Sequence, residues 1–109
     1  MPALFGIPTN LPIHSATNTL VAVNWADLVD GSIVNSLSAA GVTNNFWWSG
    51  SEDATGSFIT GVTANCGGWV SSLAADGGNF GSPANVDSSW MVSGAATCDQ
   101  TLAVICVGY

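Results

Sequence analysis

The sequence predicts one small domain that is rich in β-structure, with long loops and one short helix. Its 109 residues fit a single domain over 1–109, since domains of about 100–150 residues are the commonest size. Apolar residues make up 48% of the chain, which is enough to fill a core. The apolar segments are short and are separated by Gly, Asn, Asp and Ser. Such spacing is typical of strands joined by turns.

The first residues predict an irregular beginning followed by a strand. Residues 1–19 hold three of the four prolines and many small polar residues, so we expect an extended lead-in there. The run Leu-Val-Ala-Val at 20–23 favours a short strand. The dipeptide Asp30-Gly31 is a turn signal, after which the chain is expected to change direction.

One segment has helical spacing. Within residues 32–40, the apolar side chains Ile33, Val34 and Leu37 recur at the interval that places them on one face of a helix. Gly41 follows directly and is a common helix stop. We therefore predict one short helix over 32–40.

The rest of the chain reads as short strands and loops. The apolar segments expected to form strands lie at 46–48, 58–59, 69–70, 90–92 and 102–107. The longest stretch without periodicity is 71–89, which is broken by Gly, Pro, Asn and Asp. A long irregular loop in a compact domain is often functional. We therefore place the candidate ligand site in this loop.

The charge pattern excludes two classes of partner. The chain has no Lys and no Arg, and its net charge is −7. Binding to nucleic acid and to anionic lipid depends on cationic side chains, so neither partner is expected. The longest apolar run, 102–107, is far shorter than the roughly 20 residues that cross a bilayer. We therefore predict no membrane span.

Three cysteines, Cys66, Cys98 and Cys106, lie in the second half of the chain. Because the count is odd, at least one sulfur is free or pairs with another molecule. The residues alone leave open a bond between Cys98 and Cys106, another pairing, or no bond in a reducing compartment. Widely spaced cysteines and a polar, uncharged surface favour an extracellular or cell-surface location. The first residues lack the basic segment of a signal peptide, so export is expected to need a leader not seen here.

Candidates for catalysis are few. His14 is the only histidine and lies in the lead-in, where we expect an exposed loop residue. No Gly-x-Ser-x-Gly segment accompanies it. The carboxylates Glu52 and Asp53 are adjacent, a spacing that points them in different directions and favours a hydrated turn. We therefore predict that the protein is not an enzyme.

No metal cofactor is expected. One histidine and three separated cysteines match a structural zinc site poorly. Calcium is the remaining alternative, because Asp76, Asn79, Asn85 and Asp87 supply the hard oxygen ligands that calcium prefers. Turn-forming side chains are the simpler interpretation of these four residues.

Five tryptophans can either fill the core or contact a ligand. Trp25, Trp48, Trp69 and Trp90 lie in apolar segments, where a core position is expected. If Trp48 points inward from a strand, Trp47 points outward. We therefore predict that Trp47 is the exposed tryptophan.

The order of several short motifs resembles that of an uncharacterised bacterial extracellular domain family. That domain is commonly found on surface lipoproteins and is similar in fold to endostatin and the C-type lectins. The motifs are NWADLVDGSI at 24–33, WSGS at 48–51 with Gly56 following, NCGGW at 65–69, SW at 89–90, TC at 97–98 and IC at 105–106. The resemblance covers about residues 7–107, and the combined order is much more specific than any one motif.

The resemblance implies an α+β, C-type-lectin-like fold: a twisted antiparallel sheet, long loops and one or two flanking helices. It implies that Trp48, Ser49 and Gly50 lie on the central strand and that Cys66 pairs with Cys98, a pairing that the larger closed loop also favours. Cys106 would lie on the terminal strand. In the family that cysteine is bridged to an N-terminal helix, which this sequence is expected to lack. Cys106 is then left unpaired or free for an intermolecular bond.

The motifs Glu-Pro-Asn, Gln-Pro-Asp and Trp-Asn-Asp of the calcium-dependent sugar-binding lectins are absent. We therefore expect a non-enzymatic extracellular binding or adhesion module that recognises a macromolecule or glycan through its loop face. The residues expected to contact ligand are Trp47, Asp76, Asn79, Asn85 and Asp87. The alternative is a structural subunit that assembles with copies of itself, because low charge and high apolar content favour such contacts.

Overall fold

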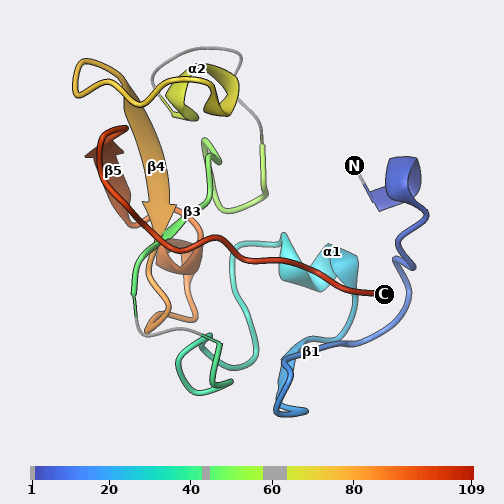
Figure 1. The fold of residues 1–109 in the computed structure, drawn as a ribbon. Coiled ribbons are helices and arrows are strands. Elements are labelled where there is room, and N and C mark those ends of the chain that lie inside the picture. The colour runs from blue at the N-terminus through green and yellow to red at the C-terminus, as the bar shows by residue number, and fades with distance from the viewer. Residues whose placement is uncertain (1, 43–44, 58–63) are drawn as a thin grey trace.

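Two antiparallel sheets organise the chain. The computed structural model describes residues 2–42, 45–57 and 64–109 and shows a small α+β domain with few helices (Figure 1). The elements in order are η1 (Pro2–Phe5), β1 (Ile13–His14), β2 (Leu20–Ala22), α1 (Trp25–Leu28), β3 (Trp47–Trp48), α2 (Cys66–Trp69), β4 (Gly77–Gly81), η2 (Ser88–Trp90) and β5 (Gly94–Thr97). None of the helices in these ranges has the length and apolarity that crossing a membrane requires.

The larger sheet has the order β3-β4-β5, with β4 in the centre. In its register Trp48 lies opposite Phe80, and Phe80 lies opposite Gly94. Glycines make this sheet possible, because aromatic rings lie directly on its backbone. A Cβ atom on Gly78 would lie 2.8 Å from the Trp48 ring, and one on Gly81 would lie 2.6 Å from the Trp47 indole nitrogen.

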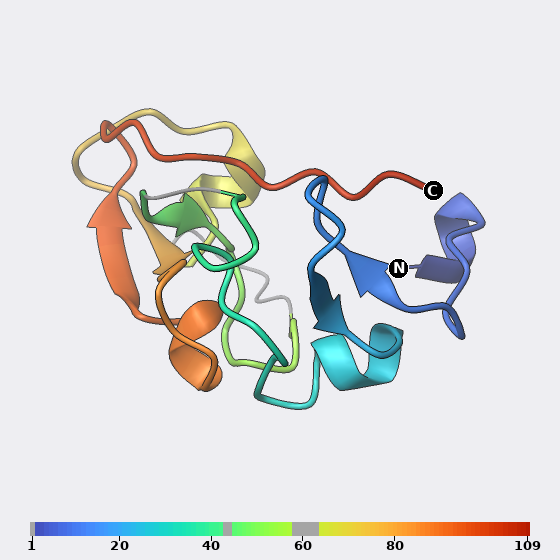
Figure 2. The ribbon, with the colours of Figure 1, turned by 90° about the horizontal axis from the view of Figure 1, so that it is seen from below.

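The N-terminal hairpin and α1 lie to one side of the larger sheet (Figure 2). The C-terminal segment passes from the larger sheet across to this N-terminal part. β1 pairs with β2 in the smaller sheet. The first turn of α1 is capped from both directions: the Asn24 Oδ1 atom accepts a hydrogen bond from the Asp27 amide, and the Asp27 carboxylate accepts one from the Val23 amide. Reciprocal bonds of this kind satisfy amides that a helix start leaves unpaired.

The core lies between the two sheets. Its buried members are Val21, Ala22, Leu28, Ile33, Leu37, Ala40, Trp47, Trp90 and Met91. The rings of Trp47 and Trp90 stack with their centroids 5.6 Å apart. The Trp47 indole N–H also donates to the Trp90 carbonyl at 3.0 Å. This pair joins β3 to η2.

Residues 32–40 form turns, so the predicted helix is wrong. Their backbone instead pairs outward: the Val34 amide donates to the Val21 carbonyl at 2.9 Å. The Asn35 side chain donates to the Leu20 carbonyl at 2.9 Å. These two bonds tie the segment to β2, whereas a helix keeps its backbone bonds within the segment. Ile33 and Leu37 are nevertheless buried, so the spacing identified core residues but not a helix.

Other boundaries also differ from the predictions. The lead-in 1–19 contains η1 and β1, and the predicted loop 71–89 contains β4, the longest strand described. Residues 69–70 and 90–92 meet the ends of α2 and η2 rather than strands. The segment 102–107 forms only an isolated parallel bridge, between Ala103 and Trp47. The predicted strands at 20–23 and 46–48 are confirmed in part by β2 and β3, and 58–59 lies outside the described residues.

The disulfide between Cys66 and Cys98 is confirmed, with Cα atoms 5.7 Å apart. It joins α2 to the end of β5. Cys106 has a free, exposed thiol.

Candidate functional site

The turn α2 is left-handed. Its four residues Cys66, Gly67, Gly68 and Trp69 have φ angles of 52°, 65°, 77° and 67°. The turn is closed by the Trp69 amide, which donates to the Asn65 carbonyl at 2.8 Å. The Asn65 side chain accepts from the Gly68 amide at 2.9 Å. Glycine adopts positive φ freely, but each of the other two residues loses about 1–2 kcal/mol in this conformation.

Three contacts hold the strained turn in place. Cys66 is tied to β5 by its disulfide. The Trp69 ring meets the Trp48 ring edge-on, with centroids 6.1 Å apart. It also lies so close to the backbone of Gly50 that a Cβ atom there would be 2.3 Å from its Cζ2 atom. We call Trp48, Gly50 and Trp69 the tryptophan platform.

Trp69 is the exposed tryptophan of the described chain, with 48% of its surface accessible. The prediction for Trp47 is therefore wrong, because Trp47 is buried and Trp48 is half-buried. The two side chains do alternate, but Trp47 takes the inward face, where it bonds to Trp90. The signal that sequence reasoning missed is the glycine pair before Trp69, which permits the turn that carries the indole outward.

Two of the predicted ligand residues lie beside the platform. The Asn79 side chain on β4 donates to the Ser51 carbonyl at 2.7 Å. The Asn79 carbonyl accepts from the amides of Ser49 and Gly50, at 3.1 Å each. The half-buried Asp76 carboxylate accepts a hydrogen bond from the Ser71 hydroxyl, two residues beyond Trp69. Hydroxyl, amide and carboxylate groups thus lie on the segments next to the platform.

The other two predicted ligand residues lie past the opposite end of β4. The Asn85 side chain accepts from the Ser82 hydroxyl at 2.8 Å, and the Asp87 carboxylate caps η2 by accepting from the Ser89 amide at 3.0 Å. Since β4 has five residues, about 16 Å of strand separates these two from Asp76. One calcium ion therefore does not contact all four side chains. Within the described ranges no three His, Cys, Asp or Glu residues gather in a metal-binding group.

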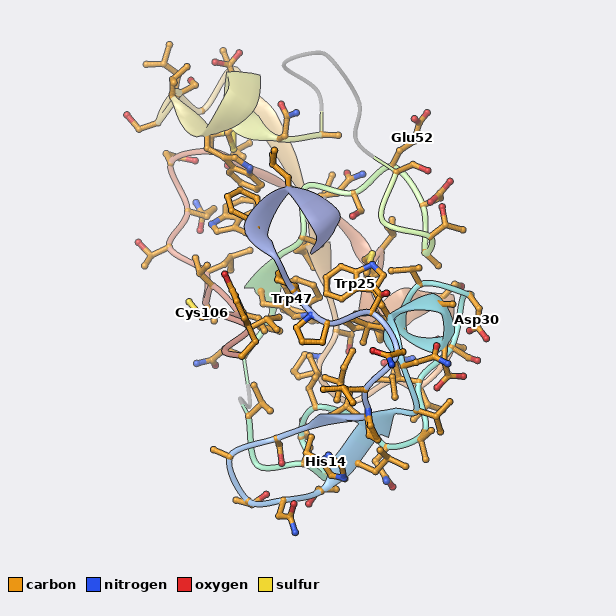
Figure 3. All side chains as sticks on the ribbon, turned by 90° about the vertical axis from the view of Figure 1, so that its right-hand side faces the viewer. His14, Trp25, Asp30, Trp47, Glu52 and Cys106 are labelled. Atoms are coloured by element: carbon orange, nitrogen blue, oxygen red, sulfur yellow. A yellow bond between two sulfur atoms is a disulfide. The ribbon has the colours of Figure 1, made fainter. Side chains whose placement is uncertain are left out.

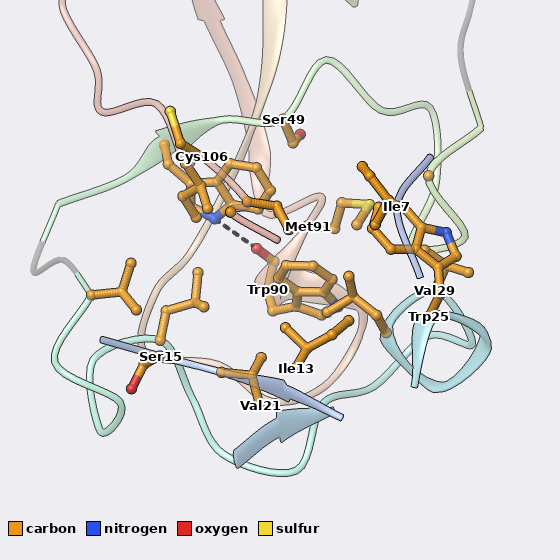
Figure 4. Close-up of a pocket in the computed structure, with 18 of the residues that line it drawn as sticks. Ile7, Ile13, Ser15, Val21, Trp25, Val29, Ser49, Trp90, Met91 and Cys106 are labelled. Atoms are coloured by element: carbon orange, nitrogen blue, oxygen red, sulfur yellow. Dashed lines mark hydrogen bonds between the residues drawn. The ribbon is translucent and has the colours of Figure 1, made fainter. Parts of the chain in front are cut away.

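An apolar cavity of about 1360 Å³ lies between the N-terminal residues and the core (Figure 4). Trp47 and Trp90 form one wall, joined by the hydrogen bond drawn there. Trp25 and Cys106 also line the cavity, which reaches the platform at Trp69. The cavity therefore connects the core side chains with the platform.

The residues considered for catalysis are spread over the molecule. His14, on the hairpin, and Glu52, in an exposed turn, are well apart in Figure 3. Asp53 closes an exposed turn, where its carboxylate accepts from the Thr55 hydroxyl at 2.6 Å and from the Thr55 amide at 2.8 Å. These bonds hold the pKa of Asp53 below its ordinary value of 3.8. Asp53 therefore has a structural explanation, and adjacent Glu52 lies exposed in the same turn.

Comparison with known proteins gives no match: no family model, no curated protein and no solved structure is significantly similar to the chain. Membership of the C-type-lectin-like family stays a prediction from the motifs.

Proposed function

We propose that the protein is a non-enzymatic binding module, acting outside the cell or at its surface, that recognises a macromolecule through the tryptophan platform. The observation that carries this proposal is the half-exposed indole of Trp69 on a strained, left-handed turn. Backbone strain in a folded protein persists where surrounding contacts enforce it, and it concentrates at functional sites.

The platform is suited to binding because it is rigid before a ligand arrives. The disulfide, the Trp48 ring and the Gly50 backbone each restrict Trp69. A side chain that is already ordered loses little entropy on binding, which strengthens the complex. Tryptophan also offers a large amphipathic contact area with few rotatable bonds. The disulfide supports the extracellular part of the proposal, since such bonds persist in oxidising compartments.

A neutral glycan is the favoured ligand. Sugar rings have apolar faces that stack on an indole and hydroxyls that bond to groups such as those of Ser71, Asp76 and Asn79. The chain has no Lys or Arg to pair with a sulfate or uronate, and its charge of −7 repels acidic polymers.

The test is affinity electrophoresis in native gels that contain a soluble neutral polysaccharide, such as a β-glucan or a mannan. Alginate serves as the acidic comparison. We expect a neutral polysaccharide to retard the wild-type protein, and Trp69→Ala to weaken binding by at least about tenfold, as expected for an aromatic anchor worth about 1.4 kcal/mol or more.

The matched control is Phe46→Ala. Phe46 is an aromatic residue with the same 48% exposure, but it packs against Phe80 on another part of the sheet. We expect this variant to bind as the wild type does. If the Trp69→Ala variant is retarded as much as the wild type, the platform is excluded as the binding site. If only alginate retards the wild type, a neutral glycan is excluded as the ligand.

A further inference from the structure

The C-terminal segment 103–109 has no strand structure after the bridge at Ala103, and its hydrogen bonds to described residues lie only near its ends, while Ile105 packs against the core. The Ala103 amide donates to the Phe46 carbonyl at 3.2 Å, and the Ala103 carbonyl accepts from the Trp48 amide at 2.9 Å. At the other end, the Tyr109 hydroxyl donates to the Phe5 carbonyl. Between these anchors the backbone of 104–108 makes no hydrogen bond to any residue that the structure describes. Figure 2 shows this stretch crossing between the two parts of the molecule.

The composition of this segment favours β-pairing. Residues 104–107, Val-Ile-Cys-Val, are apolar and strand-forming and contain no charge, proline or glycine. Val104 is 72% exposed, and Cys106 and Val107 are also exposed. Proteins usually place charged side chains or proline in such a segment, and these residues prevent it from pairing with another chain. This segment has neither protection.

The pairing of Ala103 determines which backbone groups are free to bond. In a strand, the N–H and C=O of one residue point to the same side, and successive residues alternate. Ala103 directs both groups toward β3. Residues 104, 106 and 108 therefore direct theirs away from β3, and these are the groups that a new strand would meet.

We propose that residues 104–108 pair antiparallel with the same residues of a second copy of the chain, around a two-fold axis at Cys106, and that a Cys106–Cys106 disulfide then locks the pair. An antiparallel pair about a two-fold axis is self-complementary, so one exposed strand is sufficient. All seven carboxylates precede residue 100, so the two negatively charged copies meet through an uncharged segment. Cys106 lines the cavity that reaches the tryptophan platform, and the pairing of this segment adds an assembly role to the binding role.

The geometry fits a covalent link. In this register residue 104 faces 108 of the second copy, 106 faces 106, and 108 faces 104, which gives about six backbone hydrogen bonds. Directly opposed, hydrogen-bonded residues have Cα atoms about 5.5 Å apart, within the range of about 4.4–6.8 Å found for disulfides. The two thiols lose two protons and two electrons as the S–S bond forms. A small disulfide oxidant, oxidised glutathione, accepts them and leaves as two glutathione thiols.

The test combines sedimentation of the chain that has a free Cys106 thiol and an intact Cys66–Cys98 disulfide, called the reduced chain, with oxidation by glutathione disulfide and peptide mapping. We expect the reduced chain to dimerise reversibly and the oxidised chain to contain a peptide linked Cys106 to Cys106. Val104→Pro removes one donor from each copy at the paired edge. The dissociation constant of the reduced dimer should then rise about 30-fold, given about 1 kcal/mol net for each of two hydrogen bonds.

The matched control is Val107→Pro, whose amide points to the other side. It should change the dissociation constant by less than about threefold, since a surface substitution away from the contact has an effect within about 0.5 kcal/mol. Cys106→Ser should keep the reversible dimer but not the covalent one. A reduced protein that stays monomeric at every concentration, equal effects of the two proline variants, or Cys106 capped by glutathione instead of linked to itself would each overturn the proposal.

Discussion

Replacing Gly50 with alanine tests how the tryptophan platform is held. The added Cβ atom would lie 2.3 Å from the Trp69 Cζ2 atom, a distance at which one of the two groups must move. Gly50 also has a φ angle of 60°, which alanine adopts at a loss of about 1–2 kcal/mol. Forcing an extra methyl group into a filled space destabilises by about 1–3 kcal/mol more. We therefore expect Gly50→Ala to lower the free energy of unfolding by about 3 kcal/mol.

The assay is urea unfolding followed by tryptophan fluorescence. With a slope of about 1.5 kcal/mol per molar urea, the midpoint should fall by about 2 M. Gly68→Ala is the matched control, because Gly68 has a φ angle of 77° but no atom within 4 Å of the position of its Cβ atom. Gly68→Ala should lose only the stability that the backbone conformation costs, about 1–2 kcal/mol. If the two variants lose the same stability, the indole does not press on Gly50 and the reasoning about a rigid platform is refuted.

Three further predictions concern the rest of the fold. Replacing Cys66 and Cys98 together with serine opens a loop with a sequence separation of 32 residues, and chain entropy predicts a loss of about 4 kcal/mol in chemical unfolding. Trp47→Phe removes the buried hydrogen bond to Trp90 and leaves a void, so thermal unfolding should show a loss of about 3 kcal/mol. Because hydrogen bonds lower the pKa of Asp53 below its ordinary value of 3.8, the ionised carboxylate stabilises the fold at pH values above 3.8. This stabilisation is lost as the pH falls through the folded-state pKa. Melting of Asp53→Asn between about pH 5 and pH 2 should therefore depend less steeply on pH than melting of the wild type.

The sequence predicted some elements and contacts of the fold correctly. The strand at Leu20–Ala22 was expected from an apolar run, and Val21 and Ala22 are buried in it. The Cys66–Cys98 pairing, implied by motif order, is confirmed. In contrast, the spacing of Ile33 and Leu37 was correct for burial but not for a helix, because the Val34 amide and the Asn35 side chain bond the backbone of β2.

Glycine was the main source of error. In 71–89 the glycines were interpreted as loop signals, yet Gly78 and Gly81 are in the central strand. Their role depends on Trp48 and Trp47, which are distant in sequence and whose rings occupy the space where a side chain would otherwise be. The residues next to a glycine in the sequence do not indicate that an aromatic ring from a distant segment occupies the space beside its Cα atom. The same argument applies to Gly50, and it explains why sequence reasoning chose Trp47 over Trp69.

The way in which the carboxylates are held also determines how the protein should respond to salt. Asp27, Asp53 and Asp87 each accept hydrogen bonds from groups a few residues away, so their turns are closed by amides and hydroxyls. The chain has no Lys or Arg, so dissolved ions have almost no attraction to weaken and chiefly screen the repulsion among seven negative charges. Ionic strength, which loosens many proteins by weakening their ion pairs, should make this one more stable.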